Sequence, residues 1–415
     1  MSFSSPATLT GPEPDDEWID AELLQQIRSR LLKETGPVTP AKVAEALRAS
    51  GKVFGTAAIL ELVERLSAQI SGAGPLQRLL DDPRITDVFV NAPRDVWFDA
   101  GEGLQRANIT LGGEAEVRAL AMRLAATGGR RLDESSPLVD ARLPDGVRVN
   151  AVIPPISGRY TSLSLRIPRP VAFSLDELVA NGTLLPSWRP VLEALISRRK
   201  NFLISGGTGA GKTALLGTLL GLVSAHERLI AIEDAPELVI SHPHFVQLSA
   251  RHQNIEGAGE VNQADLVRNA MRMRPDRLVV GECRGAEVRE LFTALNTGHE
   301  GGCGTVHANT TEDVPARLEA LGGLAGLDHD AVAAQACSAL DVLVHVRRAG
   351  PHRMITHIAL LVRDSNRNMA VLDCLERERN VKGDGPPGQH QTRLGPGWVE
   401  LADLLGLDPR WRRGR

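Results

Sequence analysis

The chain has 415 residues, of which 42% are hydrophobic, so it is long enough for two or three domains with cores of their own. The net charge is −4, so overall charge does not attract the chain to nucleic acid or to an anionic membrane. The sequence has no apolar run of about 18 residues, and its first residues lack the basic and apolar regions of a signal peptide.

The first part of the chain divides into three predicted segments. Residues 1–16 are rich in Ser and Pro and are expected to be disordered. Residues 17–72 are predicted to form a short helical module, because apolar residues recur at helical spacing. This module could serve either as a cap that packs on the rest of the chain or as an element that docks a partner. Residues 75–168 alternate strand patterns with a helix at 114–126, which predicts a small α/β domain.

From residue 169 to residue 348, short apolar strands alternate with helices. The strands are predicted at 202–204, 228–232, 245–248, 277–280, 304–307 and 342–346. This alternation is typical of a parallel sheet with helices on both faces. Residues 349–415 are set apart as a C-terminal extension, partly flexible, in which 351–372 could form a last strand pair and 380–397 is rich in Gly, Pro and Gln.

The second half is organised around residues 201–213, which read NFLISGGTGAGKT. A short apolar strand leads into a phosphate loop of the form G-x-x-x-x-G-K-T, made of Gly206, Gly207, Thr208, Gly209, Ala210, Gly211, Lys212 and Thr213. Glycines let the backbone aim its N–H groups at phosphate oxygens, Lys212 supplies charge to the terminal phosphates, and Thr213 can hold Mg²⁺. A glycine-rich turn that binds nothing is the alternative. The order of strand, loop and helix favours a nucleoside triphosphate site.

Acidic side chains follow two of the predicted strands. Glu233 and Asp234 end the strand at 228–232, where a carboxylate can hold the attacking water or the metal. An acidic pair that caps a helix is the alternative at this position. Glu282 follows Gly281 after the strand at 277–280, where most P-loop proteins carry an Asp for Mg²⁺. The longer Glu side chain reaches the metal through water or polarises the nucleophile.

His299 and His307 flank a glycine-rich turn and a short strand. A metal site is disfavoured, because no Cys or carboxylate completes a tight ligand set and the four cysteines form no C-x-x-C pair. Isolated histidines are usually surface or core residues. Beside a phosphate loop, an imidazole that reports the γ-phosphate is the better interpretation.

The predicted small α/β domain carries a series of arginines: Arg131, Arg142, Arg148, Arg159 and Arg166. Arginines brought from another domain or subunit stabilise the charge that develops in phosphoryl transfer. Ordinary solvated arginines on strands are the alternative.

Taken together, these stretches resemble the secretion ATPases of the type II and type IV secretion superfamily, over about residues 74–345. Three segments are similar to the tight-adherence (Flp) pilus assembly ATPases in particular: GRRLDESSPLVDARLPDG at 129–146, RPDR at 274–277 and NTGH at 296–299. The resemblance implies an α/β fold in which a RecA-like P-loop ATPase domain is preceded by a smaller α/β N-terminal domain. It also implies ATP and Mg²⁺ as cofactors.

The resemblance assigns catalytic roles to five residues already named: Lys212, Glu233, Glu282, His299 and His307. By this resemblance, Glu233 activates water, Glu282 belongs to an atypical Walker B motif, and the two histidines form a His box. Thr213 and Glu282 would hold the metal. Three arginines stand where relatives contact phosphate: Arg142, Arg159 and Arg166. Cys283 departs from the aliphatic residue that relatives usually carry, and the tetracysteine module of the type II branch is absent.

The function implied is that of a hexameric motor that hydrolyses ATP to power Flp-type pilus assembly or protein secretion across the inner membrane. Its expected partner is an inner-membrane platform protein, with no direct contact to nucleic acid. Its expected location is cytoplasmic, peripheral at the inner face of the plasma membrane. A conjugation or DNA-translocation ATPase of the same superfamily is the alternative. A non-hydrolysing nucleotide switch that scaffolds a complex and a small-molecule kinase are weaker ones, since no lid or acceptor pocket is evident.

Overall fold

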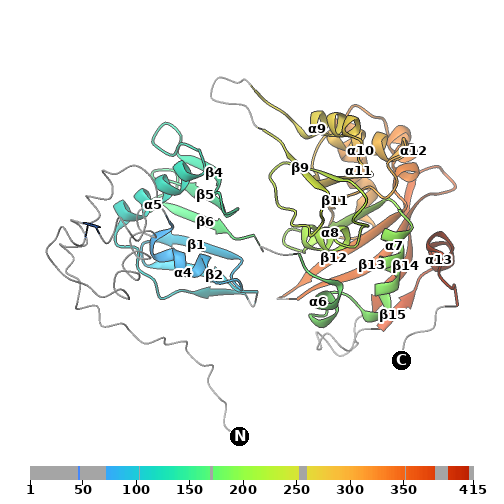
Figure 1. Ribbon diagram of the computed structural model, residues 1–415, viewed down its shortest axis with the longest axis horizontal. Helices are drawn as coiled ribbons and strands as arrows, with labels where there is room; N and C mark the ends of the chain where they lie inside the picture. Colours follow the sequence, from blue (N-terminus) through green and yellow to red (C-terminus); the bar gives the residue numbers. More distant parts are fainter. Residues whose placement is uncertain are drawn as a thin grey trace, which may run out of the picture. The chain divides into compact units, whose positions relative to one another are not determined.

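The computed structural model describes residues 72–410 except 102, 169–171, 252–258, 351 and 379–390, and it also describes residues 45 and 46. The predicted disordered start at 1–16 and nearly all of the predicted helical module at 17–72 lie outside the described residues. The chain divides into two compact units, Met1–Pro168 and Arg169–Arg415 (Figure 1).

The first unit contains one antiparallel sheet with the strand order β3-β2-β1-β6-β5-β4. Its strands are β1 (Asp87–Ala92), β2 (Asp95–Asp99), β3 (Leu104–Arg106), β4 (Leu138–Arg142), β5 (Arg148–Val152) and β6 (Ser162–Arg166). Within its described residues the helices are η2 (Gly74–Leu76), α4 (Gln77–Leu80) and α5 (Glu114–Thr127). Helix α5 buries residues at helical spacing, namely Val117, Leu120, Ala121, Leu124 and Ala125. This stripe and the alternate residues of the central strands share one core.

The second unit is built on a nine-stranded sheet with the order β15-β14-β13-β12-β7-β11-β10-β8-β9. The strands from β12 to β9 in this order pair in parallel: β7 (Phe202–Gly206), β8 (Leu229–Glu233), β9 (Phe245–Ser249), β10 (Arg277–Cys283), β11 (Cys303–His307) and β12 (Val342–Ala349). An antiparallel wing follows: β13 (His352–Arg363), β14 (Met369–Glu378) and β15 (Gln391–Leu394). The predicted alternation of strands and helices therefore gives the predicted parallel sheet.

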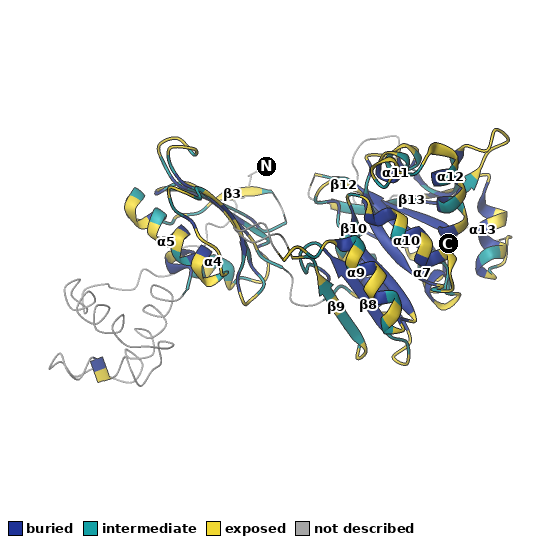
Figure 2. Ribbon diagram, turned by 90° about the horizontal axis from the view of Figure 1, so that it is seen from above, coloured by how far each residue is buried: buried dark blue, intermediate teal, exposed yellow. Residues whose placement is uncertain are grey.

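Helices cover both faces of this sheet, and the central strands between them are buried along their whole length (Figure 2). The helical elements of this unit are α6 (Leu175–Ala180), η3 (Pro186–Trp188), α7 (Arg189–Ser197), α8 (Lys212–Leu220), α9 (Gln263–Ala270), η4 (Met271–Met273), α10 (Glu287–Asn296), α11 (Asp313–Leu324), α12 (His329–Ala339) and α13 (Trp398–Leu405). One core lies under α7, α8 and α13, and the other lies under α9 to α12. Within the described ranges, no helix combines the length and the apolar character needed to cross a bilayer.

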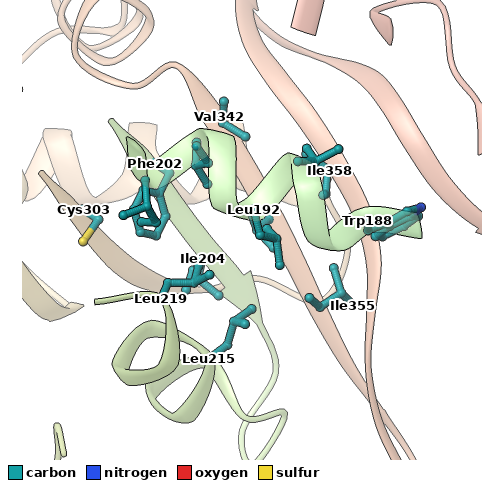
Figure 3. Packing of buried hydrophobic residues seen from close by; sticks show 14 of the residues in the cluster. Trp188, Leu192, Phe202, Ile204, Leu215, Leu219, Cys303, Val342, Ile355 and Ile358 are labelled. Carbon is teal, nitrogen blue, oxygen red and sulfur yellow. The ribbon is translucent and has the colours of Figure 1, made fainter. Parts of the chain in front are cut away.

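The first of these cores holds the stem of the phosphate loop in place. Phe202 and Ile204 of β7 pack with Leu215 and Leu219 of α8 in the same buried cluster (Figure 3). Burying a side chain of this size contributes roughly 1.5–3 kcal/mol. The strand before the loop and the helix after it are thus fixed by the same apolar contacts.

The C-terminal residues continue this sheet and core, although the sequence analysis set residues 349–415 apart as an extension. Strands β13 and β14 extend the sheet beyond β12, and β15 lies within the stretch that we expected to be flexible. The buried Trp188 donates from Nε1 to Thr392 Oγ1 at 2.9 Å, which ties β15 to η3. Helix α13 packs its buried Trp398 and Leu401 into the same cluster.

Candidate active site

The parallel strands bring the predicted site residues to one edge of the sheet. Strands β7 and β11 are paired in register, with Gly206 opposite His307. Strand β10 lies next to β11 and ends in the segment that holds Glu282, and β8 lies beyond it and ends at Glu233. The carboxyl ends of parallel strands share an edge, which is where ligands bind in open α/β sheets. The loop and three predicted side chains therefore lie on consecutive strands.

The phosphate loop joins β7 to α8 through a backbone that requires glycine. Gly211 has φ 97°, a left-handed conformation that other residues rarely adopt, and it directly precedes the helix. A Cβ atom on Gly206 would lie 2.3 Å from the Val346 carbonyl oxygen of β12, so only glycine fits there. Lys212 is buried, and its ammonium donates to the Gly206 and Gly207 carbonyl oxygens at 3.0 and 3.1 Å. This glycine-lined cradle with a lysine curled over it fits the phosphates of a nucleotide.

His307 connects this lysine to Glu282. Its Nε2 atom lies 2.6 Å from Glu282 Oε1, and Lys212 Nζ lies 3.3 Å from the same nitrogen. Burial lowers the pKa of His307, the Lys212 charge lowers it further, and the Glu282 carboxylate opposes both. The imidazole is therefore neutral at neutral pH. The other Glu282 oxygen, Oε2, accepts from Arg284 at 2.5 Å, so the carboxylate lies between the His307 ring and the Arg284 guanidinium.

Glu233 is buried, and both of its carboxylate oxygens accept hydrogen bonds from the loop that follows it and from β9. Oε1 accepts from the backbone N–H groups of Glu237 and Leu238 at 2.9 Å each, and Oε2 accepts from Gln247 at 2.5 Å. Burial raises the pKa of Glu233, and these hydrogen bonds oppose the rise. These contacts resemble the alternative role considered for Glu233 and Asp234, in which the acidic pair caps a helix. Here the Glu233 carboxylate accepts from the N–H groups of a loop. The role of Glu233 in activating water stays a prediction.

Two further contacts hold these strand ends together. A Cβ atom on Gly281 would lie 2.6 Å from Glu233 Cγ, so Gly281 lets β10 and the Glu233 side chain approach closely. With its amide oriented to satisfy both partners, Gln263 donates to the Glu282 carbonyl oxygen at 3.2 Å and accepts from the Asp234 N–H at 2.8 Å. Gln263 begins α9 and is buried, so it is a residue of the site that the sequence analysis missed.

His299 lies at the other end of β11. The strand runs from Cys303, which pairs with Phe202 at the start of β7, to His307, which pairs with Gly206. His299 precedes this strand, and its Nδ1 lies 3.0 Å from the Ala294 carbonyl oxygen in the last turn of α10. Within one chain, β11 therefore separates His299 from the loop, and the catalytic role of His299 stays a prediction.

Metal binding at this edge would depend on the nucleotide. Within the described part of the chain, no group of three or more His, Cys, Asp or Glu side chains could hold an ion by itself. Mg²⁺ commonly takes one or two protein oxygens together with substrate phosphates and water. Thr213 lies in the first turn of α8 next to Lys212, and Glu282 lies across β11, so the donor types present fit that mode.

The first unit places three of its arginines in one row. Arg142 of β4 pairs with Arg148 of β5, and Arg148 pairs with Arg166 of β6. Arg159 lies outside the strands and stacks over the Tyr160 ring, with 5.2 Å between the guanidinium carbon and the ring centroid. Arg142 and Arg166 are thus close together on one sheet, and their contact with phosphate stays a prediction.

Two arginines that the sequence analysis did not single out lie at the loop. Arg353 of β13 donates from Nε to the Gly209 carbonyl oxygen at 3.1 Å. Arg348 of β12 brings Nη1 to 3.5 Å from the position that a Cβ of Gly209 would take. No motif marks these residues, because only the pairing of β12 with β7 brings them to the loop.

A phosphate loop on a RecA-like parallel sheet, with Lys212, His307 and Glu282 gathered at its edge, defines a P-loop ATPase. The chain belongs to the type II/IV secretion system protein family, whose model matches residues 69–375. The expected closeness to the Flp pilus branch in particular is not among these findings.

Several known proteins are similar to this chain. A putative conjugal transfer protein of Mycobacterium tuberculosis is 49% identical over 327 residues, which cover 77% of this chain and 93% of that protein. The conjugal transfer protein TrbB of Rhizobium radiobacter is 30% identical and covers 67% of this chain and 84% of its own. Among solved structures, the VirB11 ATPase of the Brucella suis type IV secretion system is 26% identical, covers 69% of this chain and 95% of its own, and gives a TM-score of 0.37.

Proposed function

We propose that this protein is the ATP-hydrolysing motor of a secretion or conjugation machine. The observation that carries the proposal is the contact of His307 with both Lys212 and Glu282 at the mouth of the phosphate loop. A P-loop ATPase needs a cation for the terminal phosphates, a group that reports the γ-phosphate and an acid for Mg²⁺ or its water. These three side chains supply one of each.

Bound ATP would supply the phosphoryl group, and Mg²⁺ would neutralise part of its charge. Lys212 exchanges its two carbonyl contacts for the terminal phosphates, which stabilises the charge that develops on transfer. Thr213 and Glu282 would hold the metal or its water. Glu233 orients the attacking water once its side chain leaves the Glu237 and Leu238 amides, or it keeps the loop in shape for that step.

The neutral state of His307 supports its role as a sensor. A neutral imidazole carries one N–H donor and one acceptor, so the ring can accept from Lys212 or donate to Glu282. When the terminal phosphate draws Lys212 away, the partner of the ring changes. His307 thus couples the presence of that phosphate to the position of Glu282. His299 has no such contact in one chain, so its place in the mechanism depends on an assembly of several copies.

Ring assembly and membrane partners belong to the same proposal. We assign the protein to a homo-hexamer at the inner face of the plasma membrane, held there by a platform protein. Arg142, Arg159 and Arg166 would add positive charge near the nucleotide in that ring. Release of phosphate would then drive domain movement in the partner complex.

Two machines are candidates for the load. Flp-type pilus assembly or protein secretion is supported by the three segments described in the sequence analysis. Conjugal transfer is supported by the names of the M. tuberculosis and R. radiobacter relatives, which are conjugal transfer proteins. Stimulation of ATP hydrolysis by DNA would favour conjugation, and the acidic net charge favours a protein load.

The test is ATP hydrolysis by the purified protein, with and without Mg²⁺. Wild type should hydrolyse ATP only with the metal, and Lys212→Ala should remove nearly all turnover. A wild-type protein that binds ATP tightly without turnover would support a nucleotide switch instead. Mass measurement with a non-hydrolysable ATP analogue tests the hexamer separately.

A further inference from the structure

Two arginines of the β12–β13 hairpin lie against the phosphate loop on the flank of β7 that faces away from β11. Strand β12 pairs with β7 there, and β13 pairs with β12 in the antiparallel wing. In that pairing Arg348 and Arg353 are directly opposite each other. Their side chains therefore leave the hairpin on the same face.

Arg353 contacts the middle of the loop, and Arg348 lies beside it. Arg353 donates from Nε to the Gly209 carbonyl oxygen at 3.1 Å, and its Cδ lies 3.1 Å from the position that a Cβ of Gly211 would take. Arg348 donates from its own Nε to Gly350 at 3.0 Å, which holds the side chain over the hairpin. Its Nη1 lies 3.5 Å from the Cβ position of Gly209.

This arrangement concentrates positive charge. Lys212 of the same loop adds a third cation, with its ammonium held by Gly206 and Gly207. Arginine forks match phosphate oxygens, so guanidinium groups at this place suit the phosphates of a nucleotide held by the loop.

The Arg353 contact also fixes the shape of the loop. In a trans peptide the C=O and the following N–H point in opposite directions, so anchoring the Gly209 oxygen sets the direction of the Ala210 N–H. That N–H donates to the Gly207 carbonyl oxygen at 3.3 Å and closes the turn of the cradle. Arg353 thus helps to set the conformation of the loop at Gly209 and Ala210.

We propose that Arg348 binds the phosphates of the nucleotide held by the loop, and that Arg353 is a positioning residue that keeps the loop in its binding shape. The inference rests on the proposed function, since it takes the nucleotide as the ligand. The first unit was expected to supply arginines to the phosphates. The inference adds two arginines from the same sheet as the phosphate loop. The hairpin thereby becomes part of the nucleotide site.

The first experiment measures the affinity of the full chain for mant-ADP, a fluorescent ADP. Arg348→Ala should weaken binding about tenfold, the effect of one lost charge-assisted contact, and Arg348→Lys should recover part of it. The matched control is Arg347→Ala, since Arg347 is also exposed but lies on the alternate face of β12. Arg347→Ala should bind mant-ADP as wild type does.

The second experiment tests Arg353 through steady-state hydrolysis. Arg353→Met keeps the packing against Gly211 but removes the donor to Gly209, so the KM for ATP should rise about tenfold while Tm stays unchanged. Arg353→Lys should rescue part of this loss, because an ammonium can still donate to the carbonyl oxygen. An equal KM in wild type and Arg353→Met would refute the positioning role.

The outcomes separate this inference from the proposed function. If Lys212→Ala loses mant-ADP while Arg348→Ala binds as tightly as Arg347→Ala, the loop is a nucleotide site and the arginine inference is overturned. If wild type itself binds no mant-ADP, both the inference and the proposed function fail.

Discussion

The imidazole of His307 lies between an acid and a base of the same edge: its Nε2 is 2.6 Å from Glu282 Oε1 and 3.3 Å from Lys212 Nζ. The ends of β10 and β11 and the first residue of α8 supply these groups, so the His307 side chain contacts a residue of each neighbouring element. Residues that act as a unit give strongly non-additive effects when each is replaced.

His307→Gln and Glu282→Gln should each lower kcat by roughly 100-fold, the usual effect of removing one preorganised polar contact to the reacting phosphate. The double variant should be hardly worse than either single variant, because the two side chains share one contact. The measurement is steady-state ATP hydrolysis by all three proteins. Effects that multiply would contradict the coupling.

His299→Ala should leave kcat of the isolated chain within about twofold of wild type, as for a surface substitution away from a special feature. The reason is its position at the opposite end of β11, where Nδ1 contacts the Ala294 carbonyl oxygen. His307→Ala, assayed beside it, should lose turnover. A comparable loss in His299→Ala, in protein shown to be monomeric, would place His299 in the site after all.

Gly281→Ala should destabilise the second unit by about 1–3 kcal/mol, because the new methyl group would meet Glu233 Cγ at 2.6 Å in a packed region. ATP hydrolysis should fall with it, since Glu233 and Glu282 both lie beside Gly281. Urea denaturation gives the change in unfolding free energy. The control is Gly323→Ala in α11, where an added Cβ meets nothing within 4 Å and should be tolerated or slightly stabilising.

Stability should fall in mild acid because of His345, which is buried in β12 with Nδ1 2.9 Å from Ser205 Oγ. Burial lowers the pKa of His345 to about 4, and the nearby His357 adds to the shift. The unfolded chain therefore binds the proton more tightly than the folded chain does. The contribution is complete above pH 6.5 and is lost as pH falls toward 4.

The size of this effect is at most about 3 kcal/mol, at 1.36 kcal/mol per pKa unit. Urea denaturation at several pH values between 7.5 and 4, for wild type and His345→Asn, isolates it, because all other groups titrate in both proteins. The stability difference between the two proteins should shrink as the pH falls. A difference that stays constant with pH would contradict the assignment.

The sequence was sufficient to predict the parallel sheet and its functional edge, because local signals mark them. The loop motif and the apolar strands before Glu233 and Glu282 are readable in short windows. The direction of a parallel strand then fixes which end of it meets the ligand. His307 follows from the same rule, since it ends its strand.

The parts that could not be predicted depend on contacts between distant residues. His299 and His307 share a motif, but only the length of β11 shows that the strand separates them. The engagement of Glu233 by Gln247 and Gly281 depends on three different strands. Arg348 and Arg353 reach the loop through the pairing of β12 with β7, which leaves no local pattern.

The close approach of Gly206 to Val346 has a mechanical consequence. Because β7 packs closely against β12 at Gly206, there is little room for this end of β7 to move toward β12. We therefore expect the start of the phosphate loop to keep its position when a ligand binds or leaves. Conformational change during turnover would then occur in other, less tightly packed segments and not in this part of β7.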